Sequence, residues 1–230
     1  CEDGYGWKSD DGKWVAESAA TASNVKVMEA PIKSVTINGE TAGLVVTKTY
    51  GESGVVLTGN IDYGSGSGTA AQKWYQVNNN TATEIPDAGS LAYELTTSLA
   101  AGTYTYRLTV TIDGYSKSCD ATVIVKPADI KDAQIVVSNK DDLVFTPGAD
   151  GTGTLLTAII VVNRGSKGLT ADTDYTVTGN QATDAGTHTL TITGTGNYTG
   201  TETAEWEIKQ HTVTVPNNPD IISDISKPYD

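Results

Sequence analysis

Three aromatic side chains near the start of the sequence have the types and spacing of a small ligand-binding surface. Tyr5, Trp7 and Trp14 flank the dipeptide Asp11-Gly12, which favours the positive φ of a tight β-hairpin turn. Aromatic rings on the arms of such a hairpin can stack on a sugar ring or another flat ligand. A hairpin this short cannot bury a core of its own, so the same rings can instead cover a neighbouring domain. The sequence leaves both interpretations open.

Residues for acid–base or nucleophilic catalysis are sparse and scattered. The two histidines, His188 and His211, fall in different segments, and we expect His188 to face the same side of its strand as the neighbouring threonines. The sequence has no Gly-x-Ser-x-Gly elbow and no His pair at helical spacing, and its carboxylates spread over expected loops. We therefore predict no catalytic residue and no cofactor, and we expect that the protein is not an enzyme.

Carboxylate pairs provide the only candidate metal ligands. Asp172 and Asp174, and the turn Asp10-Asp11-Gly12, present the oxygen ligands that Ca²⁺ prefers. The same residue types also cap turns through their side-chain oxygens. We favour turn capping at these positions and predict no metal site.

The two cysteines, Cys1 and Cys119, allow two interpretations. Cys1 can be the lipid-modified first residue of a lipoprotein. Alternatively, an even number of cysteines in an oxidising compartment allows a disulfide between Cys1 and Cys119. We favour the disulfide slightly, because the aromatic hairpin begins only a few residues after Cys1 and leaves little room for a tether.

Charge and hydrophobicity exclude several classes of partner. The chain of 230 residues has 15 basic and 28 acidic side chains, a formal net charge of −13 and a pI near 4.4. Nucleic-acid binding requires clustered Lys and Arg, so we expect no nucleic-acid partner. An acidic chain also avoids anionic membrane surfaces, and no run approaches the ~20 apolar residues of a membrane span. We therefore expect no membrane insertion within these residues.

The composition predicts an all-β protein of about two domains. Threonine and valine are abundant, 24 glycines supply turns, and there is one Phe and one Met. We expect an aromatic segment at 1–29 and a first β-sandwich at 30–126. Its predicted strands are Ile32–Asn38, Leu44–Thr49, Val55–Ile61, Gln72–Val77, Thr83–Ile85, Leu91–Thr96, Thr103–Ile112 and Lys117–Val125.

A second β-domain is predicted at 127–209, after the short linker Lys126-Pro127-Ala128-Asp129. Its expected strands are Ala133–Ser138, Leu143–Thr146, Leu155–Asn163, Tyr175–Gly179, Thr187–Thr193 and Thr203–Lys209. Residues 210–230 read as the start of a further module or as an exchanged strand, beginning with His211–Val215. Pro127 stiffens the linker, so we expect the two sandwiches to be arranged end to end.

The first domain resembles an immunoglobulin-like (Ig-like) domain. In Lys73-Trp74-Tyr75-Gln76, Trp74 is similar to the core tryptophan of strand C, and in Ala101-Gly102-Thr103-Tyr104, Tyr104 is similar to the tyrosine-corner residue of strand F. Tyr106 stands where the strand-F cysteine of animal domains would be. The resemblance therefore implies a sandwich without the inter-sheet disulfide, as in bacterial Ig-like domains, with Trp74, Tyr104 and Tyr106 in its core.

The second domain resembles the "TGxGNYxGT" type of bacterial Ig-like repeat through the run from Thr193 to Thr201, followed by Trp206. Such repeats occur in secreted and wall-associated proteins of Gram-positive, notably gut, bacteria. The resemblance implies structural roles for Tyr198 and Trp206 and an extracellular or cell-surface location. Separately, the Gly-Trp-Lys and Gly-Lys-Trp spacing around Trp7 and Trp14 is similar to a single choline-binding repeat.

These resemblances favour a non-enzymatic stalk or adhesive module of a multidomain bacterial surface protein. Its partners would be neighbouring domains of the same protein and a host glycan, glycoprotein or immunoglobulin. Three alternatives remain: an accessory or carbohydrate-binding region of a larger carbohydrate-active enzyme, a strand-exchanging filament subunit, and a module that binds a host protein.

Overall fold

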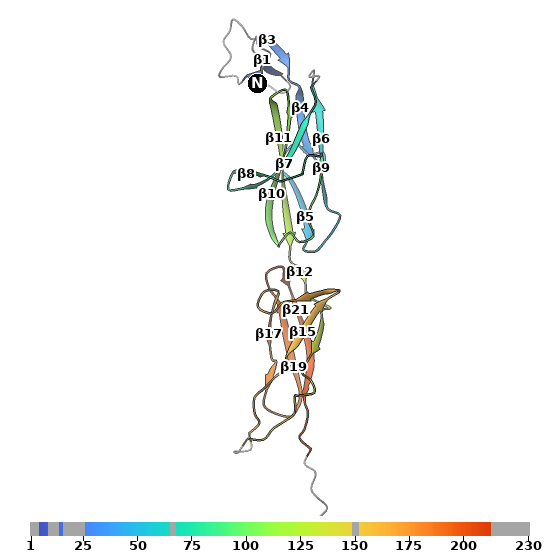
Figure 1. The fold of residues 1–230 in the computed structure, drawn as a ribbon, viewed down its shortest axis with the longest axis vertical. Coiled ribbons are helices and arrows are strands. Elements are labelled where there is room, and N and C mark those ends of the chain that lie inside the picture. Colours follow the sequence, from blue (N-terminus) through green and yellow to red (C-terminus); the bar gives the residue numbers. More distant parts are fainter. Residues whose placement is uncertain (1–4, 9–13, 16–25, 65–67, 149–151, 213–230) are drawn as a thin grey trace, which may run out of the picture. The chain divides into compact units, whose positions relative to one another are not determined.

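The computed structural model describes residues 5–8, 14–15, 26–64, 68–148 and 152–212, and every regular element within them is a β-strand (Figure 1). The chain forms two compact units. The first consists of Cys1–Asp129 together with Gly196–Thr199, and the second of Ile130–Thr195 and Gly200–Asp230. In the described part of the chain, no helix is long and apolar enough to span a membrane.

The first unit is a two-layered sandwich. One sheet has the order β4-β6-β9 and the other the order β5-β11-β10-β7-β8. The strands are β4 (Ile32–Ile37), β5 (Leu44–Thr49), β6 (Val56–Tyr63), β7 (Ala71–Asn78), β8 (Thr81–Glu84), β9 (Ala92–Glu94), β10 (Gly102–Ile112) and β11 (Tyr115–Lys126). The first strand of the sandwich, β4, lies in the three-stranded sheet. The next strand, β5, crosses to the other sheet and pairs in parallel with β11, as in Ig-like domains.

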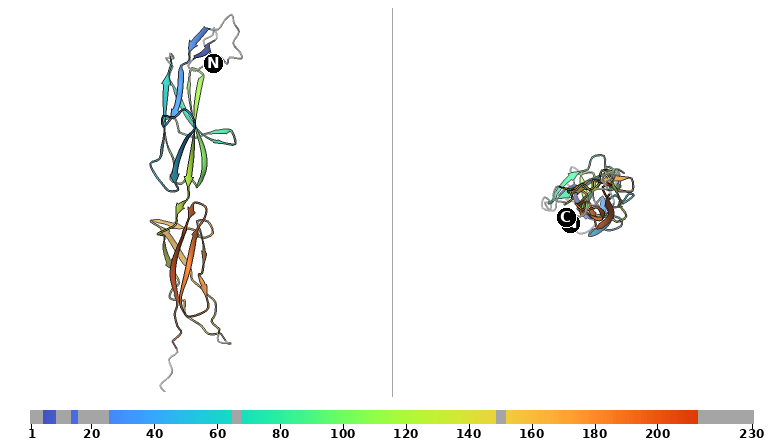
Figure 2. Two further views of the ribbon diagram at one scale, coloured as in Figure 1. Left: turned by 180° about the vertical axis from the view of Figure 1, so that it is seen from behind. Right: turned by 90° about the horizontal axis from the view of Figure 1, so that it is seen from below.

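The core of this sandwich is formed by side chains at every second position of its strands. Buried and exposed residues alternate along β6, and β10 buries Tyr106, Leu108, Val110 and Ile112 at every second position. The long β10–β11 hairpin turns at Asp113-Gly114, where both residues have positive φ. All eight strands predicted in this domain are present, and no strand end is shifted by more than two residues. Figures 1 and 2 show the short β7–β8 hairpin projecting from the body of the sandwich.

A small sheet precedes the first sandwich. It has the order β2-β1-β3, from β1 (Tyr5–Lys8), β2 (Trp14–Val15) and β3 (Lys26–Glu29). The predicted pairing of the two hairpin arms is present, because β1 pairs antiparallel with β2. The third strand was not predicted, since Lys26–Glu29 is too short to show a pattern of its own.

The second unit also contains two sheets, with orders β13-β15-β16 and β17-β19-β21, and a short β14-β18 pair. Its strands are β13 (Gln134–Val137), β14 (Leu156–Thr157), β15 (Ile160–Arg164), β16 (Lys167–Leu169), β17 (Tyr175–Thr178), β18 (Gln181–Ala182), β19 (Gly186–Gly194) and β21 (Thr201–Ile208). Leu190, Ile192 and Ile208 are fully buried in its core. The remaining strands, β12 (Ala128–Asp129) and β20 (Tyr198–Thr199), pair in parallel within the first unit.

Two predicted strands of the second domain differ from the structure. The segment Leu155–Asn163 is interrupted at Ala158, whose N–H donates to the carbonyl oxygen of Asn180, so it forms β14 and β15 separately. The segment Leu143–Thr146 forms no strand and makes one bridge, Val144 to Lys209. Of the predicted strand His211–Val215, residues 211–212 are irregular and the others lie outside the described residues.

Candidate functional site

The aromatic segment is described only by its backbone. The register of β1 and β2 pairs Trp7 with Val15 and Lys8 with Trp14, so the two tryptophans are not cross-strand partners. Tyr5 pairs with Glu29 on β3. The side chains of Tyr5, Trp7 and Trp14 lie outside the description, and ligand binding by them stays a prediction from the sequence.

Trp74 lies at the centre of the first core. Its side chain is 0% exposed, and its indole N–H donates to the carbonyl oxygen of Ser90 at 2.8 Å. Tyr93 packs between Trp74 and Tyr106, with ring centroids 5.7 and 5.5 Å apart. Tyr106 is buried, and this burial raises the pKa of its hydroxyl to about 12. These rings fill the middle of the sandwich.

Tyr104 forms the hydrogen bond of a tyrosine corner, because its hydroxyl donates to the carbonyl oxygen of Ala100 at 3.0 Å. Tyr198 is buried in the first unit, where its ring meets Tyr50 edge-on at 5.5 Å. The ring of Tyr198 therefore contributes to the packing of the first unit, although the residue belongs to the sequence motif of the second.

Cys119 has a free thiol in the structure, so the favoured disulfide to Cys1 is not formed there. The Cys119 side chain is 3% exposed, and its Sγ lies 3.3 Å from the carbonyl oxygen of Glu40 and 3.4 Å from that of Thr41. Burial raises the pKa of this thiol. A disulfide would require a second sulfur to enter this packed site, while Cys1 itself lies outside the described residues.

His188 does not face the neighbouring threonines, so that prediction is wrong. Even-numbered residues of β19 point inward with Leu190 and Ile192, and His188 follows the same alternation. Its ring packs on Trp206 with centroids 5.0 Å apart. Its Nε2 lies 2.8 Å from the carbonyl oxygen of Asp184 and must carry the proton, because a carbonyl oxygen only accepts.

The aspartates of the second domain act in a turn. Asp172 adopts positive φ, and its N–H donates to the carbonyl oxygen of Tyr175. The Asp174 carboxylate accepts a hydrogen bond from the N–H of Thr170 at 3.0 Å. Within the described ranges, no group of three or more His, Cys, Asp or Glu side chains is placed to hold a metal ion.

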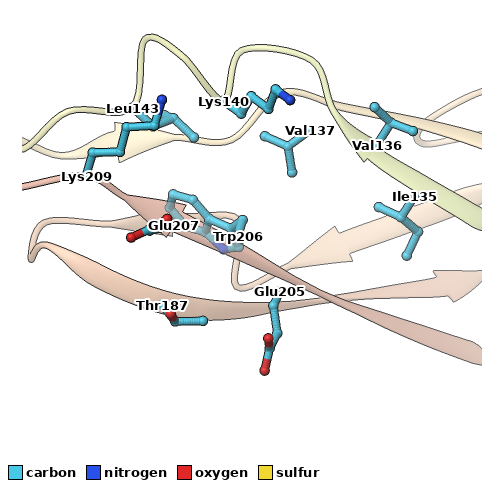
Figure 3. Close-up of a pocket in the computed structure, with 10 residues that line it drawn as sticks. All are labelled: Ile135, Val136, Val137, Lys140, Leu143, Thr187, Glu205, Trp206, Glu207 and Lys209. Atoms are coloured by element: carbon cyan, nitrogen blue, oxygen red, sulfur yellow. The ribbon is translucent and has the colours of Figure 1, made fainter.

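The second unit has a groove of about 510 Å³ between β13 and β21 (Figure 3). Ile135 and Val137 project from β13 toward the side on which Trp206 lies, whereas Val136 projects away. Leu143 contributes to the apolar wall, and the Trp206 indole N–H donates to the carbonyl oxygen of Gly179 at 2.9 Å. The floor is thus apolar and held in place. The residues lining the groove are Ile135, Val136, Val137, Lys140, Leu143, Thr187, Glu205, Trp206, Glu207 and Lys209.

Both walls of the groove are sheet edges. Among the described residues, β13 and β21 each stand at the end of their sheet order. Lys209 exchanges backbone hydrogen bonds with Leu143 and Phe145 across the outer edge of β21. Because backbone groups alternate in direction along a strand, those of Glu205 and Glu207 face this same outer edge. Within the described residues, the groove therefore presents backbone donors and acceptors of β21 as well as apolar side chains.

Two polar contacts join the segments on either side of β13 to the elements opposite. At one end the N–H of Asp132 donates to the Glu202 carboxylate at 2.8 Å. At the other end the backbone of Lys209 is hydrogen-bonded to Leu143 and Phe145, and the Lys209 Nζ lies 3.0 Å from the Asp141 carboxylate. The hydrogen bond from Lys209 lowers the pKa of the Asp141 carboxyl below its ordinary value.

Sequence reasoning missed this groove, because Trp206 was interpreted as a core residue only. One signal in the sequence did point to a feature that the two units share. We call it the corner element: a glycine followed two residues later by Tyr104 or His188, whose side chain bonds to a backbone carbonyl upstream. Ala101-Gly102-Thr103-Tyr104-Thr105 and Ala185-Gly186-Thr187-His188-Thr189 share four of their five residues, and both Gly102 and Gly186 have positive φ. His188 accordingly bonds to the carbonyl oxygen four residues upstream, as Tyr104 does.

Comparison with known proteins gives only distant likenesses. No family model and no curated protein matches the chain. Among solved structures it is similar to a fragment of titin (16% identity, covering 77% of this chain and 99% of that chain, TM-score 0.35). It is also similar to the fibronectin(III)-like modules of Clostridium thermocellum CbhA (15% identity, 79% and 99% covered, TM-score 0.28). A third is a Bacteroides ovatus glucan-utilization protein solved with a heptasaccharide (10% identity, 81% and 76% covered, TM-score 0.27). The chain is nevertheless an all-β protein with an Ig-like sandwich, as its own strand order and packing establish.

Proposed function

We propose that this chain is an extracellular, non-enzymatic structural and adhesive module of a multidomain bacterial surface protein. Its Ig-like sandwiches would space other domains from the cell or present a binding surface. The observation that carries the proposal is the presence of two β-units in one chain that share the same corner element at Tyr104 and His188. Serial modules that fold around their own cores suit a spacer or a presenting scaffold.

The outer face of the larger sheet supports this proposal. Arg107 makes a two-pronged ion pair with Asp120 across β10 and β11, with N–O distances of 2.7 and 2.8 Å. The hydroxyls of Thr109 and Ser118 lie 2.9 Å apart on the next cross-strand pair. Polar pairs of this kind keep an exposed sheet face soluble while they hold the strands in register. The net charge of −13 adds to solubility.

Surface labelling of the native protein in its source cells tests the proposed location. Antibodies against this chain should label intact cells, and protease added outside should remove the signal. Detection of the protein only after lysis, in the cytosolic fraction, would contradict an extracellular role.

The adhesive part of the proposal is tested by binding to host glycans and immunoglobulins. We expect the double variant Trp7→Ala/Trp14→Ala to lose binding, whereas Tyr63→Ala, at a side chain that is 50% exposed on the first sandwich, should retain it. Equal binding by both variants would exclude the aromatic segment as the adhesive surface. Absence of any binding would leave spacing as the proposed role.

A further inference from the structure

The groove of the second unit lies where the first unit has an additional strand. In the first unit β5 pairs in parallel with β11 over six residues, Leu44–Thr49. The corresponding segment of the second unit pairs with β21 only at the bridge between Val144 and Lys209. The rest of that edge, along Glu205 and Glu207, carries no strand in the described part of the structure.

We propose that this groove accepts residues His211–Val215 of a second copy of the chain as an added strand on β21. An extended segment that joins a sheet edge gains backbone hydrogen bonds, and its alternate side chains enter the adjoining pockets. The edge offers the backbone groups of Glu205 and Glu207, and the pockets are formed by Ile135, Val137, Leu143 and Trp206.

The sequence of the donated segment matches the requirements of the groove. His-Thr-Val-Thr-Val places Val213 and Val215 at alternate positions. β5 uses the same spacing, since Leu44 and Val46 pack against the core of the first unit. The intervening Thr212 and Thr214 would stand beside Glu205 and Glu207, where uncharged hydroxyls can donate to carboxylates and add no like charge.

The segment must come from a second copy, because its own copy blocks the approach. His211 follows Lys209 by two residues, and the backbone of Lys209 is already bound to Leu143 and Phe145 on the outer edge of β21. A tight reversal of the chain would run into these residues. A segment from another molecule meets no such obstacle, and Thr203–Ile208 of β21 is long enough to receive five residues. The interaction requires only the two sheet edges and is independent of the proposed cellular location.

Variants of the donated segment provide the first test. Sedimentation velocity should show concentration-dependent self-association of the full chain. Val213→Asp/Val215→Asp should weaken it at least about tenfold, because burying carboxylates in an apolar groove is costly. The control variant Thr212→Asn/Thr214→Asn, at positions facing away from the groove floor and without added charge beside Glu205 and Glu207, should retain the association. Association that is unchanged in the valine variant would overturn the proposal.

Variants of the groove provide the second test. A fluorescein-labelled peptide with the sequence of residues 210–216 should bind the full-length Val213→Asp/Val215→Asp protein, measured by fluorescence polarisation. Adding Val137→Lys to that protein should weaken binding at least about tenfold, whereas Val161→Lys, at a side chain of β15 that is 48% exposed and does not line the groove, should not. Thermal unfolding would establish that both proteins are folded, and a groove variant that unfolds would be replaced by Val137→Thr.

The remaining outcomes contradict the proposal in distinct ways. Equal loss of binding in the two lysine variants would place the peptide elsewhere than the groove. If the unchanged full chain stays monomeric while the Val213→Asp/Val215→Asp protein binds the peptide, each molecule fills its own groove with its own residues 211–215. Failure of the peptide to bind, together with a monomeric full chain, would exclude strand addition.

Discussion

The two units differ in how much of the last strand of the sandwich is paired along its outer edge. In each unit, the segment that follows the first strand runs toward that edge, but it pairs over different lengths. In the first, the chain leaves β4 and then runs beside β11 for the whole of β5, with Leu44, Val46 and Lys48 turned inward. Lys48 is itself buried, and its Nζ donates to the carbonyl oxygen of Thr96 at 2.8 Å. In the second, the described chain after β13 pairs beside β21 only through the bridge between Val144 and Lys209, the residue that follows β21.

This difference shows how small a change leaves an open groove in a sandwich. The segment after β13 contains Asn139-Lys140-Asp141-Asp142, whose polar side chains favour a turn over a strand. The edge of β21 is consequently left open beside Trp206. A sandwich can thus keep its core and its corner element while one edge becomes available for recognition.

The tryptophans provide the comparison with the largest expected effect. Trp74→Ala should lower the free energy of unfolding of the first unit by about 3–5 kcal/mol, since it leaves a cavity in a closed core. Trp206 is buried but also lines the groove, so Trp206→Ala should cost the second unit about 3 kcal/mol, at the lower end of that range. Calorimetry that follows each unit's transition checks this order, and a larger cost at Trp206 would mean that the groove is closed.

Hydrogen exchange compares the two edges directly. In the Val213→Asp/Val215→Asp protein, the amides of Glu205 and Glu207 should exchange about a hundredfold faster than those of Val123 and Val125, which lie between two paired strands. Residue-resolved NMR measures these rates. Similar protection at both edges would show that another segment pairs with β21.

The two corner residues should contribute equally, at about 1 kcal/mol each. Tyr104→Phe removes the hydrogen bond to Ala100, and His188→Phe removes the one to Asp184. His188→Tyr should preserve stability if the two corners are equivalent. Urea unfolding is the measurement, with Tyr63→Phe at an exposed position as the control. If His188→Phe does not lower the free energy of unfolding, His188 stabilises the unit by packing on Trp206 and not through its hydrogen bond.

The smallest expected effect concerns the end of the groove. The pKa of Asp141 is lowered by its hydrogen bond to Lys209, so this pair stabilises the fold above the ordinary value of 3.8 and ceases to do so as the pH falls through the lowered value. The urea midpoint of the wild type should therefore drop slightly more between pH 5 and pH 3 than that of Asp141→Asn. Asp142→Asn serves as the control, and an equal drop in all three proteins would remove any role for the pair.

The sequence by itself determined the secondary structure of the first unit. Alternation along Val56–Tyr63 and Gly102–Ile112, with turn residues such as Asp113-Gly114 between strands, is a local signal that marks each strand and its inward face. Trp74 was placed in the core by the resemblance of Lys73-Trp74-Tyr75-Gln76 to strand C of an Ig-like domain, and alternation is the rule that marks the inward face of β19. The same rule, applied correctly, would have turned His188 inward.

Only the tertiary structure decided which strand edges are covered. The strand Lys26–Glu29 and the break at Ala158 depend on partners that are distant in the chain, so no local period reveals them. The groove has the same origin. Whether β21 is paired depends on how far the segment after Leu143 runs beside it, and pairing between distant segments leaves no periodic trace in either one.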